Sequence, residues 1–153
     1  MKTTIDFATE TDLPALADLL HELFTLESDF RPERAKQLAG LKLILATPAI
    51  GQLFVLRVDR EVAGMANALI TVSTAQGTRV LLLEDVIVRR RHRGAGLGRQ
   101  LVEHVCAWAR EQGMTRVTLL ADQDNAPALA FYEKLGFEAS SMVVRRLGLG
   151  KAE

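Results

Sequence analysis

Residues 86–98 read VIVRRRHRGAGLG and run from an apolar strand through a basic, glycine-rich loop toward a helix. Glycine at alternate positions permits positive φ and lets a bulky ligand approach the main chain. The loop N–H groups can then face an anion, and a helix beginning near Gly96 adds the positive end of its dipole. The stretch predicts a phosphate or pyrophosphate site.

Other interpretations of this loop fit less well. A dinucleotide-binding motif needs a third glycine where Arg99 stands, and a P-loop needs Gly-Lys-Ser/Thr, which is absent. A flexible, solvated basic loop is the structural alternative. The preceding strand, the arginines and the following helix favour ligand binding.

The segments around the loop alternate between strand and helix patterns. Residues 80–88 are apolar on both alternating faces, which is typical of a central strand covered on both sides. Downstream we expect a helix from residue 97 that Gly113 ends, a strand at 115–121, a helix at 126–135 capped by Asn125, and strands at 137–141 and 143–147. Upstream we expect a strand at 5–7, a helix capped by Thr11, a helix at 32–46, and a hairpin of 52–58 and 62–72.

This order predicts an α/β fold, with a mixed, mostly antiparallel sheet, a β-α-β crossover and helices on both faces. At 153 residues the chain fits one domain, residues 1–153. Nineteen basic and nineteen acidic residues cancel, which argues against nucleic-acid binding. A single cysteine suits a reducing compartment, and no apolar run reaches the ~18 residues of a membrane helix. We therefore expect a soluble, cytoplasmic protein with no metal site.

Three separated motifs resemble the GNAT superfamily of N-acetyltransferases. Residues 93–98 resemble its Arg/Gln-x-x-Gly-x-Gly/Ala signature, residues 84–88 its fourth strand, and residues 125–137 its last helix and following strand. The resemblance implies acetyl-CoA as co-substrate and a primary amine of a small molecule or protein as acceptor. A homodimer is considered as the assembly.

The resemblance also implies the residues that hold the cofactor. The loop would bind the pyrophosphate, main chain near Val86 and Val88 would pair with the pantetheine arm, and Asn125 would contact that arm. The implied set is Val86, Ile87, Val88, Arg93, Gly94, Ala95, Gly96, Leu97, Gly98, Asn125, Ala128 and Tyr132. Tyr132 would lie beside the thioester sulfur and protonate the leaving thiolate, whereas the residues alone favour core packing.

Two adjacent carboxylates are the candidates for a general base. Glu84 and Asp85 each interrupt an apolar row, on opposite faces of the expected strand, and a carboxylate there is costly to bury without a purpose. A structural ion pair is the alternative for both; we favour catalysis for Glu84 and structure for Asp85. The pair resembles diamine and polyamine acetyltransferases, in which the glutamate is the proposed base acting through water. Asp85 as the base, or water without a carboxylate base, are alternatives that stay open.

The remaining polar residues favour plainer interpretations. Cys106 fits a small buried hydrophobe rather than a nucleophile, which favours direct attack by the amine. Glu22, Glu27 and Asp29 could line an acceptor pocket, although a solvated helix face is the simpler interpretation. A CoA-binding sensor without catalysis and a nucleic-acid module built on residues 89–93 are the competing functions.

Overall fold

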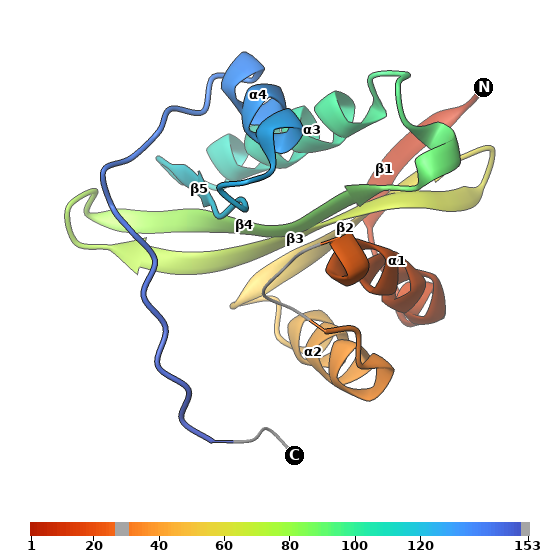
Figure 1. Cartoon of the computed structure of the whole chain (residues 1–153), viewed down its shortest axis with the longest axis horizontal. Helices are drawn as coiled ribbons and strands as arrows, with labels where there is room; N and C mark the ends of the chain where they lie inside the picture. The colour runs from red at the N-terminus through yellow and green to blue at the C-terminus, as the bar shows by residue number, and fades with distance from the viewer. Residues whose placement is uncertain (27–30, 151–153) are drawn as a thin grey trace. The chain divides into compact units, whose positions relative to one another are not determined.

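Alternating apolar residues in the first four-fifths of the chain form a mixed β-sheet. In the computed structural model, which describes residues 1–26 and 31–150, five strands follow the order β1-β2-β3-β4-β5 (Figure 1). Neighbours are antiparallel except β4 and β5, which are parallel. The strands are β1 (Thr3–Phe7), β2 (Gly51–Val58), β3 (Glu61–Ser73), β4 (Thr78–Val88) and β5 (Val117–Leu119). The mixed, mostly antiparallel sheet confirms the prediction.

The described chain divides into two compact units. The first comprises Met1–Asp122 and holds the whole sheet, and the second begins at Gln123. The predicted hairpin of β2 and β3 is confirmed, but its turn has two residues, Asp59 and Arg60, rather than the three between the expected strands, and both have positive φ.

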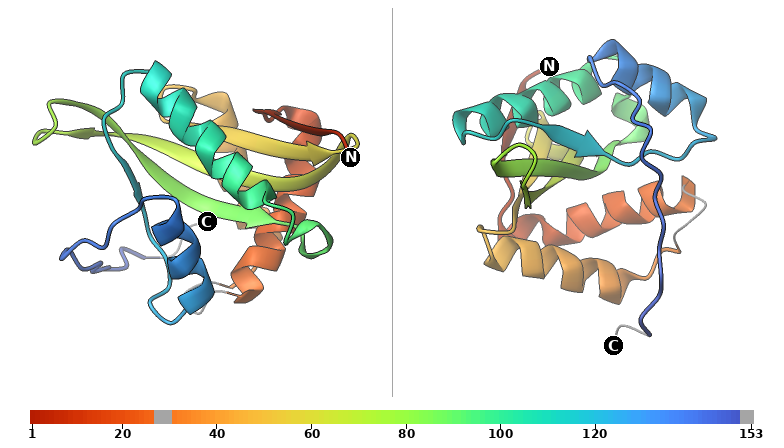
Figure 2. Two further views of the ribbon diagram at one scale, coloured as in Figure 1. Left: turned by 90° about the horizontal axis from the view of Figure 1, so that it is seen from above. Right: turned by 90° about the vertical axis from the view of Figure 1, so that its left-hand side faces the viewer.

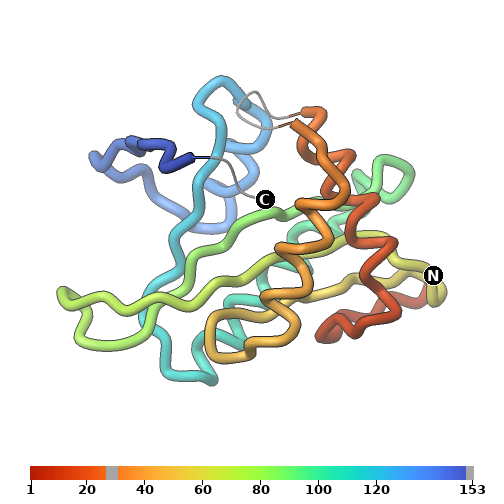
Figure 3. Tube along the Cα trace, turned by 90° about the horizontal axis from the view of Figure 1, so that it is seen from below, coloured from red at the N-terminus to blue at the C-terminus, as the bar shows by residue number. Residues whose placement is uncertain are grey.

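Helices cover both faces of the sheet in the first unit. α1 (Leu13–Leu26) and α2 (Arg34–Ala46) lie side by side on one face, and α3 (Leu97–Glu111) crosses the other (Figures 2 and 3). On the first face, leucines of α1 and Leu41 of α2 pack against Leu53, Met65 and Ile87. On the second face, the fully buried ring of Phe54 lies 5.4 Å from Trp108 of α3. Burial on both faces is what the apolar pattern of β4 predicted.

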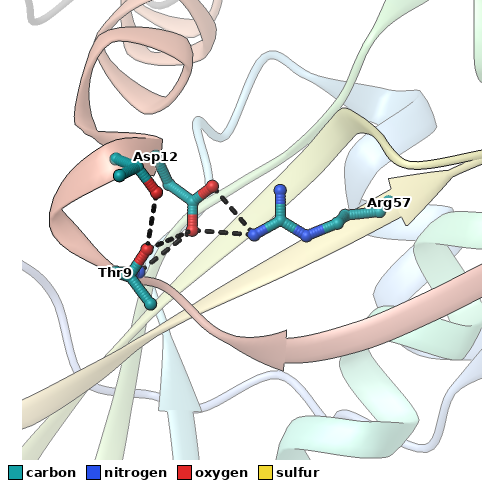
Figure 4. Close-up of polar contacts among 4 residues, drawn as sticks. Thr9, Asp12 and Arg57 are labelled. Carbon is teal, nitrogen blue, oxygen red and sulfur yellow. Dashed lines mark hydrogen bonds and ion pairs between the residues drawn. The ribbon is translucent and has the colours of Figure 1, made fainter.

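The start of α1 differs from the prediction. A short 3-10 turn, Glu10–Asp12, precedes the helix, and its N-terminal cap is Thr9 rather than Thr11. The Asp12 carboxylate accepts a hydrogen bond from Thr9 N at 2.9 Å and also binds Arg57 on β2 at 2.8 Å (Figure 4). Thr11 instead bonds the Thr9 hydroxyl. The choice of Thr11 was wrong because Thr9 forms the capping box, with Asp12 three residues further on.

The last expected strands are also corrected. The strand predicted at 115–121 is shorter, Val117–Leu119, and residues 137–141 and 143–147 form no strand in the described part of the chain. A strand needs a neighbour for its main-chain groups and a face to bury. Val143 and Leu147 are 68% and 85% exposed, so their β-forming side chains gain no burial there.

The second unit contains α4 (Ala126–Lys134). Asn125 caps it as predicted, because its side-chain oxygen accepts a hydrogen bond from Ala128 N at 3.2 Å. Gly136, with a φ of 99°, ends the helix. Within the described ranges of the chain, every helix is too short or too polar to cross a bilayer.

Candidate active site

A β-bulge in β4 is the first element of the site. β3 pairs Asn67 with Glu84 and Met65 with Ile87, so Ala66 alone stands opposite both Asp85 and Val86. The extra residue disrupts the ladder and re-aims its side chain. The regular alternation expected across residues 84–87 is therefore wrong at this point. Asp85 adopts a φ of 38°, which is strained for a residue with a Cβ.

The bulge places the Asp85 carboxylate against Asn67 of β3. Asn67 Nδ2 donates a hydrogen bond to Asp85 Oδ2 at 3.0 Å. Burial raises the pKa of Asp85 above its ordinary value, and the Asn67 hydrogen bond offsets only part of that effect. A carboxylate whose pKa is raised toward neutrality is better matched to proton transfer than a solvated one.

Asp85 and Asn67 line a cavity of about 550 Å³ whose other walls come from α1, α2 and the segment before α2. Leu20 and Phe24 of α1 and Leu41 and Ile44 of α2 make its apolar walls. Arg31, Glu33 and Lys36 contribute charged groups. This volume accommodates a small organic molecule.

Two buried amides in this cavity were not foreseen as site residues. Gln37 is 6% exposed and Asn67 is 5% exposed. Among the residues that the structure describes, Gln37 Nε2 and Oε1 and Asn67 Oδ1 have no hydrogen-bond partner. A sequence signal existed for both: Gln37 lies one turn before buried Leu41 on α2, and Asn67 interrupts the apolar row of Met65 and Leu69.

Glu84, the favoured base, is half-buried and stands opposite Asn67 in the ladder, where it makes an interaction of its own. The residues lining the cavity include Asp85 and not Glu84. The bulge thus separates the two neighbouring carboxylates into different surroundings.

The opposite edge of β4 lacks a strand partner beyond Leu83. The parallel pairing with β5 covers only Leu81, Leu82 and Leu83 in the described chain, and β5 ends at Leu119. Val86, Ile87 and Val88 follow on β4, with Ile87 and Val88 buried. Main-chain groups at this edge are therefore available to an extended ligand, as in strand addition.

The glycine loop follows directly on β4. Gly94 and Gly96 have φ of 85° and 76°, and an added Cβ at either would meet no atom within 4 Å in the described chain. Glycine is required there by conformation, and the loop stays open to a ligand. Gly96 is also the N-cap of α3 and has no side-chain oxygen, so it leaves the first N–H groups of the helix without a side-chain cap.

Arg93 holds the loop in place. Its Nε donates to Val88 O at 2.8 Å, and its Nη2 binds Glu22 of α1 at 2.9 Å. Glu22 and Arg93 line a second cavity of about 360 Å³, together with Thr25, Leu26 and Arg90. Glu22 therefore lies beside Arg93 at the start of the glycine loop and does not line the larger cavity. Glu27 and Asp29 lie outside the described residues.

The second unit holds Asn125, Ala128 and Tyr132. The side-chain oxygen of Asn125 accepts a hydrogen bond from the Ala128 N–H. Tyr132 is half-buried, with its ring between Phe131 at 5.0 Å and Phe137 at 5.6 Å. The structure defines these contacts within the unit, while the predicted carboxylates and loop belong to the first unit.

Nucleophilic and metal chemistry receive no support from the described residues. Burial raises the pKa of the Cys106 thiol, which keeps it in the less reactive protonated form. No group of three or more His, Cys, Asp or Glu side chains in the described ranges could hold a metal ion.

Solved structures share this fold. The aminoglycoside N-acetyltransferase AAC(6')-Iy in complex with CoA superposes with a TM-score of 0.82 at 22% identity, covering 97% of this chain and 96% of that one. At that identity the likeness concerns the fold.

The sequence itself places the chain in a family. It belongs to the GNAT acetyltransferase family, because the model of the Acetyltransferase (GNAT) family matches residues 13–137. The streptothricin acetyltransferase of Streptomyces lavendulae is 38% identical over 52% of this chain and 40% of its own length. The glucosamine 6-phosphate N-acetyltransferase of Trypanosoma brucei brucei is 36% identical over 56% of each chain. The chain thus spans about half the length of these relatives.

Proposed function

We propose that this protein transfers the acetyl group of acetyl-CoA directly to a primary amine that binds in the larger cavity. The observation that carries the proposal is the position of Asp85: a half-buried carboxylate at the β4 bulge lines a cavity on one side of the strand that leads into the glycine loop. Acceptor and cofactor would thus meet at one short segment, residues 84–88.

The residues present fit CoA on its chemistry. The pyrophosphate would lie on the uncapped N–H groups at the start of α3 and on the open loop of Gly94, Ala95 and Gly96. The pantetheine arm would add to the edge of β4 beyond its pairing with β5, at Val86 and Val88, where the Val88 carbonyl already accepts a hydrogen bond from Arg93. For Asn125 and Ala128, contact with CoA stays a prediction from the family resemblance.

Acetyl transfer places three demands on the protein. The amine must lose a proton, because a lysine-like amine has a pKa near ~10.4 and is charged at neutral pH. We propose Glu84 or Asp85 as the acceptor of that proton, with Asp85 favoured by its place in the cavity. The neutral amine nitrogen then forms a bond to the thioester carbon, and the Val86 N–H stabilises the oxyanion. The carbon–sulfur bond breaks with Tyr132 as the proposed proton donor to the thiolate, and the second proton lost by the nitrogen returns to Tyr132 through solvent.

A turnover screen tests this function. Purified protein and acetyl-CoA are mixed with a panel of primary amines, and free CoA thiol is measured against time. We expect thiol release that depends on both amine and protein, with the N-acetyl product identified by mass. Binding of CoA with no release for any amine would contradict the proposal and favour a sensor.

The cofactor site makes a prediction for Gly96→Glu. CoA should raise the melting temperature of the wild type, and the variant should lose that protection because the new carboxylate blocks the loop and repels phosphate. Differential scanning fluorimetry with and without CoA measures the shift.

Gly77→Glu is the matched control, because Gly77 also has a positive φ, 71°, and open surroundings, but lies in the β3–β4 turn. It should carry the same backbone strain and keep full protection. Equal protection by CoA in both variants would remove the loop from the proposed site.

The role of Tyr132 makes a second prediction. Tyr132→Phe keeps the ring contacts with Phe131 and Phe137 and removes only the hydroxyl. CoA affinity should hold while the single-turnover rate falls by about 10²-fold, as expected for lost acid catalysis. An unchanged rate in that assay would leave Tyr132 as a packing residue.

A further inference from the structure

Two buried amide side chains of the larger cavity, Gln37 and Asn67, have polar atoms without a hydrogen-bond partner in the described chain, and these atoms indicate which polar group the amine substrate carries besides its amine. Gln37 lies on α2 and Asn67 on β3, both more than nine-tenths buried and both lining the cavity with Asp85. Three of their polar atoms lack a partner in the described chain: Gln37 Nε2, Gln37 Oε1 and Asn67 Oδ1. Buried polar groups are normally hydrogen-bonded, so each exception calls for an explanation.

The stability of the folded protein does not explain why a glutamine is buried at position 37. A buried amide without a partner weakens the folded state, and an apolar side chain of similar size would pack against Leu41 without that cost. A ligand that bonds the amide would reverse the penalty. Because the side chain offers one donor group and one acceptor, it matches a group that does both, namely a hydroxyl or a carboxamide.

The part of the cavity lined by Asp85 and Asn67 offers different hydrogen-bonding groups from the part lined by Gln37. Asp85 and the unpaired Oδ1 of Asn67 are acceptors only, and Asn67 Nδ2 is already committed to Asp85. Two adjacent acceptors suit an ammonium or amine N–H donor. Asp85 and Asn67 therefore differ from Gln37 in the ligand group they can bind.

The charges of the described lining disfavour a polycation. Two acidic residues, Glu33 and Asp85, face two basic ones, Arg31 and Lys36. Glu33 is paired with Lys36 at 2.9 Å. The four wall charges thus sum to zero. Asp85 is half-buried and forms no ion pair with a described side chain, so it can receive one positive charge from a ligand.

We propose that the acceptor is a small primary amine that bears one neutral hydroxyl or carboxamide group on a short apolar skeleton. Its amine binds Asp85 and Asn67, its neutral polar group binds Gln37, and its carbon chain lies against Leu20, Phe24 and Ile44. This inference rests on the proposed acetyltransferase function and names the substrate class of that site.

A chain-length-matched panel tests the wild type. An amino alcohol, an amino carboxamide, a plain alkylamine and a diamine are compared by kcat/KM from thiol release. The amino alcohol or carboxamide should exceed both others by about 10–100-fold, since a site with buried polar groups rejects the analogue that leaves them unpaired. A preference for the diamine, or equal values, would overturn the inference while leaving acetyl transfer established. No turnover of any amine would remove the proposed function, and this inference with it.

The variant Gln37→Leu tests whether Gln37 is the residue that produces the substrate preference. We expect the variant to acetylate the plain alkylamine at least as well as the wild type and to lose the advantage of the amino alcohol. Its melting temperature should rise by about 2–6 °C, because the unpartnered amide is gone.

Gln112→Leu is the control, since Gln112 is exposed at the C-terminal end of α3 and lines neither cavity. It should leave both the substrate ratio and the melting temperature near the wild-type values. Equal losses of all substrates in Gln37→Leu, or a lower melting temperature, would mean that Gln37 is bonded within the free protein and would overturn its assignment.

Discussion

Replacement of Asp85 by Asn should lower turnover at neutral pH by about 10²–10⁴-fold, the range for loss of a positioned general base. Asn keeps the shape and can still accept the hydrogen bond from Asn67 Nδ2. It cannot take a proton from the bound ammonium. The rate should recover as pH rises toward the pKa of the free amine, because solution then supplies the neutral substrate.

Glu84→Gln is the paired variant that separates the two carboxylates. Both rates should be measured in single turnovers between pH 6 and pH 10, so that product release does not mask the chemistry. If Asp85 is the base, Glu84→Gln keeps the wild-type pH profile. The opposite result, a pH-rescued loss in Glu84→Gln alone, would assign the proton transfer to Glu84, the residue that the sequence favoured.

The variant Asp85→Asn should also be more stable than the wild type at neutral pH. Burial raises the pKa of Asp85, so the folded state holds its proton to higher pH than the unfolded state does. Stability therefore falls as pH rises from about 4 through the raised pKa, and the loss is complete above it. Asp85→Asn should melt above the wild type at neutral pH, with the gain vanishing near pH 4. Thermal melts across that range provide the check.

Asp12→Ala should have the largest effect on stability, about 3 kcal/mol of the free energy of unfolding. The Asp12 side chain is 6% exposed, bonds Thr9 N at the start of the first helix and binds Arg57 of β2 through both oxygens (Figure 4). Its removal leaves the half-buried guanidinium without a counter-charge and the Thr9 N–H without its acceptor. Urea unfolding followed by circular dichroism measures the loss.

Asp18→Ala is the control for that experiment. Asp18 also pairs with an arginine, Arg34, at 2.7 Å, but its side chain is 56% exposed. Water screens an exposed pair, so the loss should stay below about 1 kcal/mol. Equal losses in the two variants would mean that burial and capping add nothing to the Asp12 contact.

Local pattern and glycine placement were enough to predict the architecture. The two-sided apolar pattern of β4, the β2–β3 hairpin, the Asn125 cap and the loop with positive φ at Gly94 and Gly96 all appear as expected. Each of these features depends on interactions within a few residues or on the spacing of apolar residues along one element, and both can be read from the sequence. The expected strands at 137–141 and 143–147 failed because strand formation also needs a partner, which no local pattern specifies.

The amino-acid sequence by itself determined the mixed, mostly antiparallel sheet, the helices on both faces, the glycine loop with positive φ and the membership of the acetyltransferase family. Only the tertiary structure decided which polar groups meet in the cavity. The β4 bulge re-aims Asp85, and the packing of α2 against α1 and β2 brings Gln37, 30 positions earlier in the chain than Asn67, to the same space. Bulges and helix–sheet packing arise from contacts between residues far apart in sequence, so a residue's period along its own element does not reveal them.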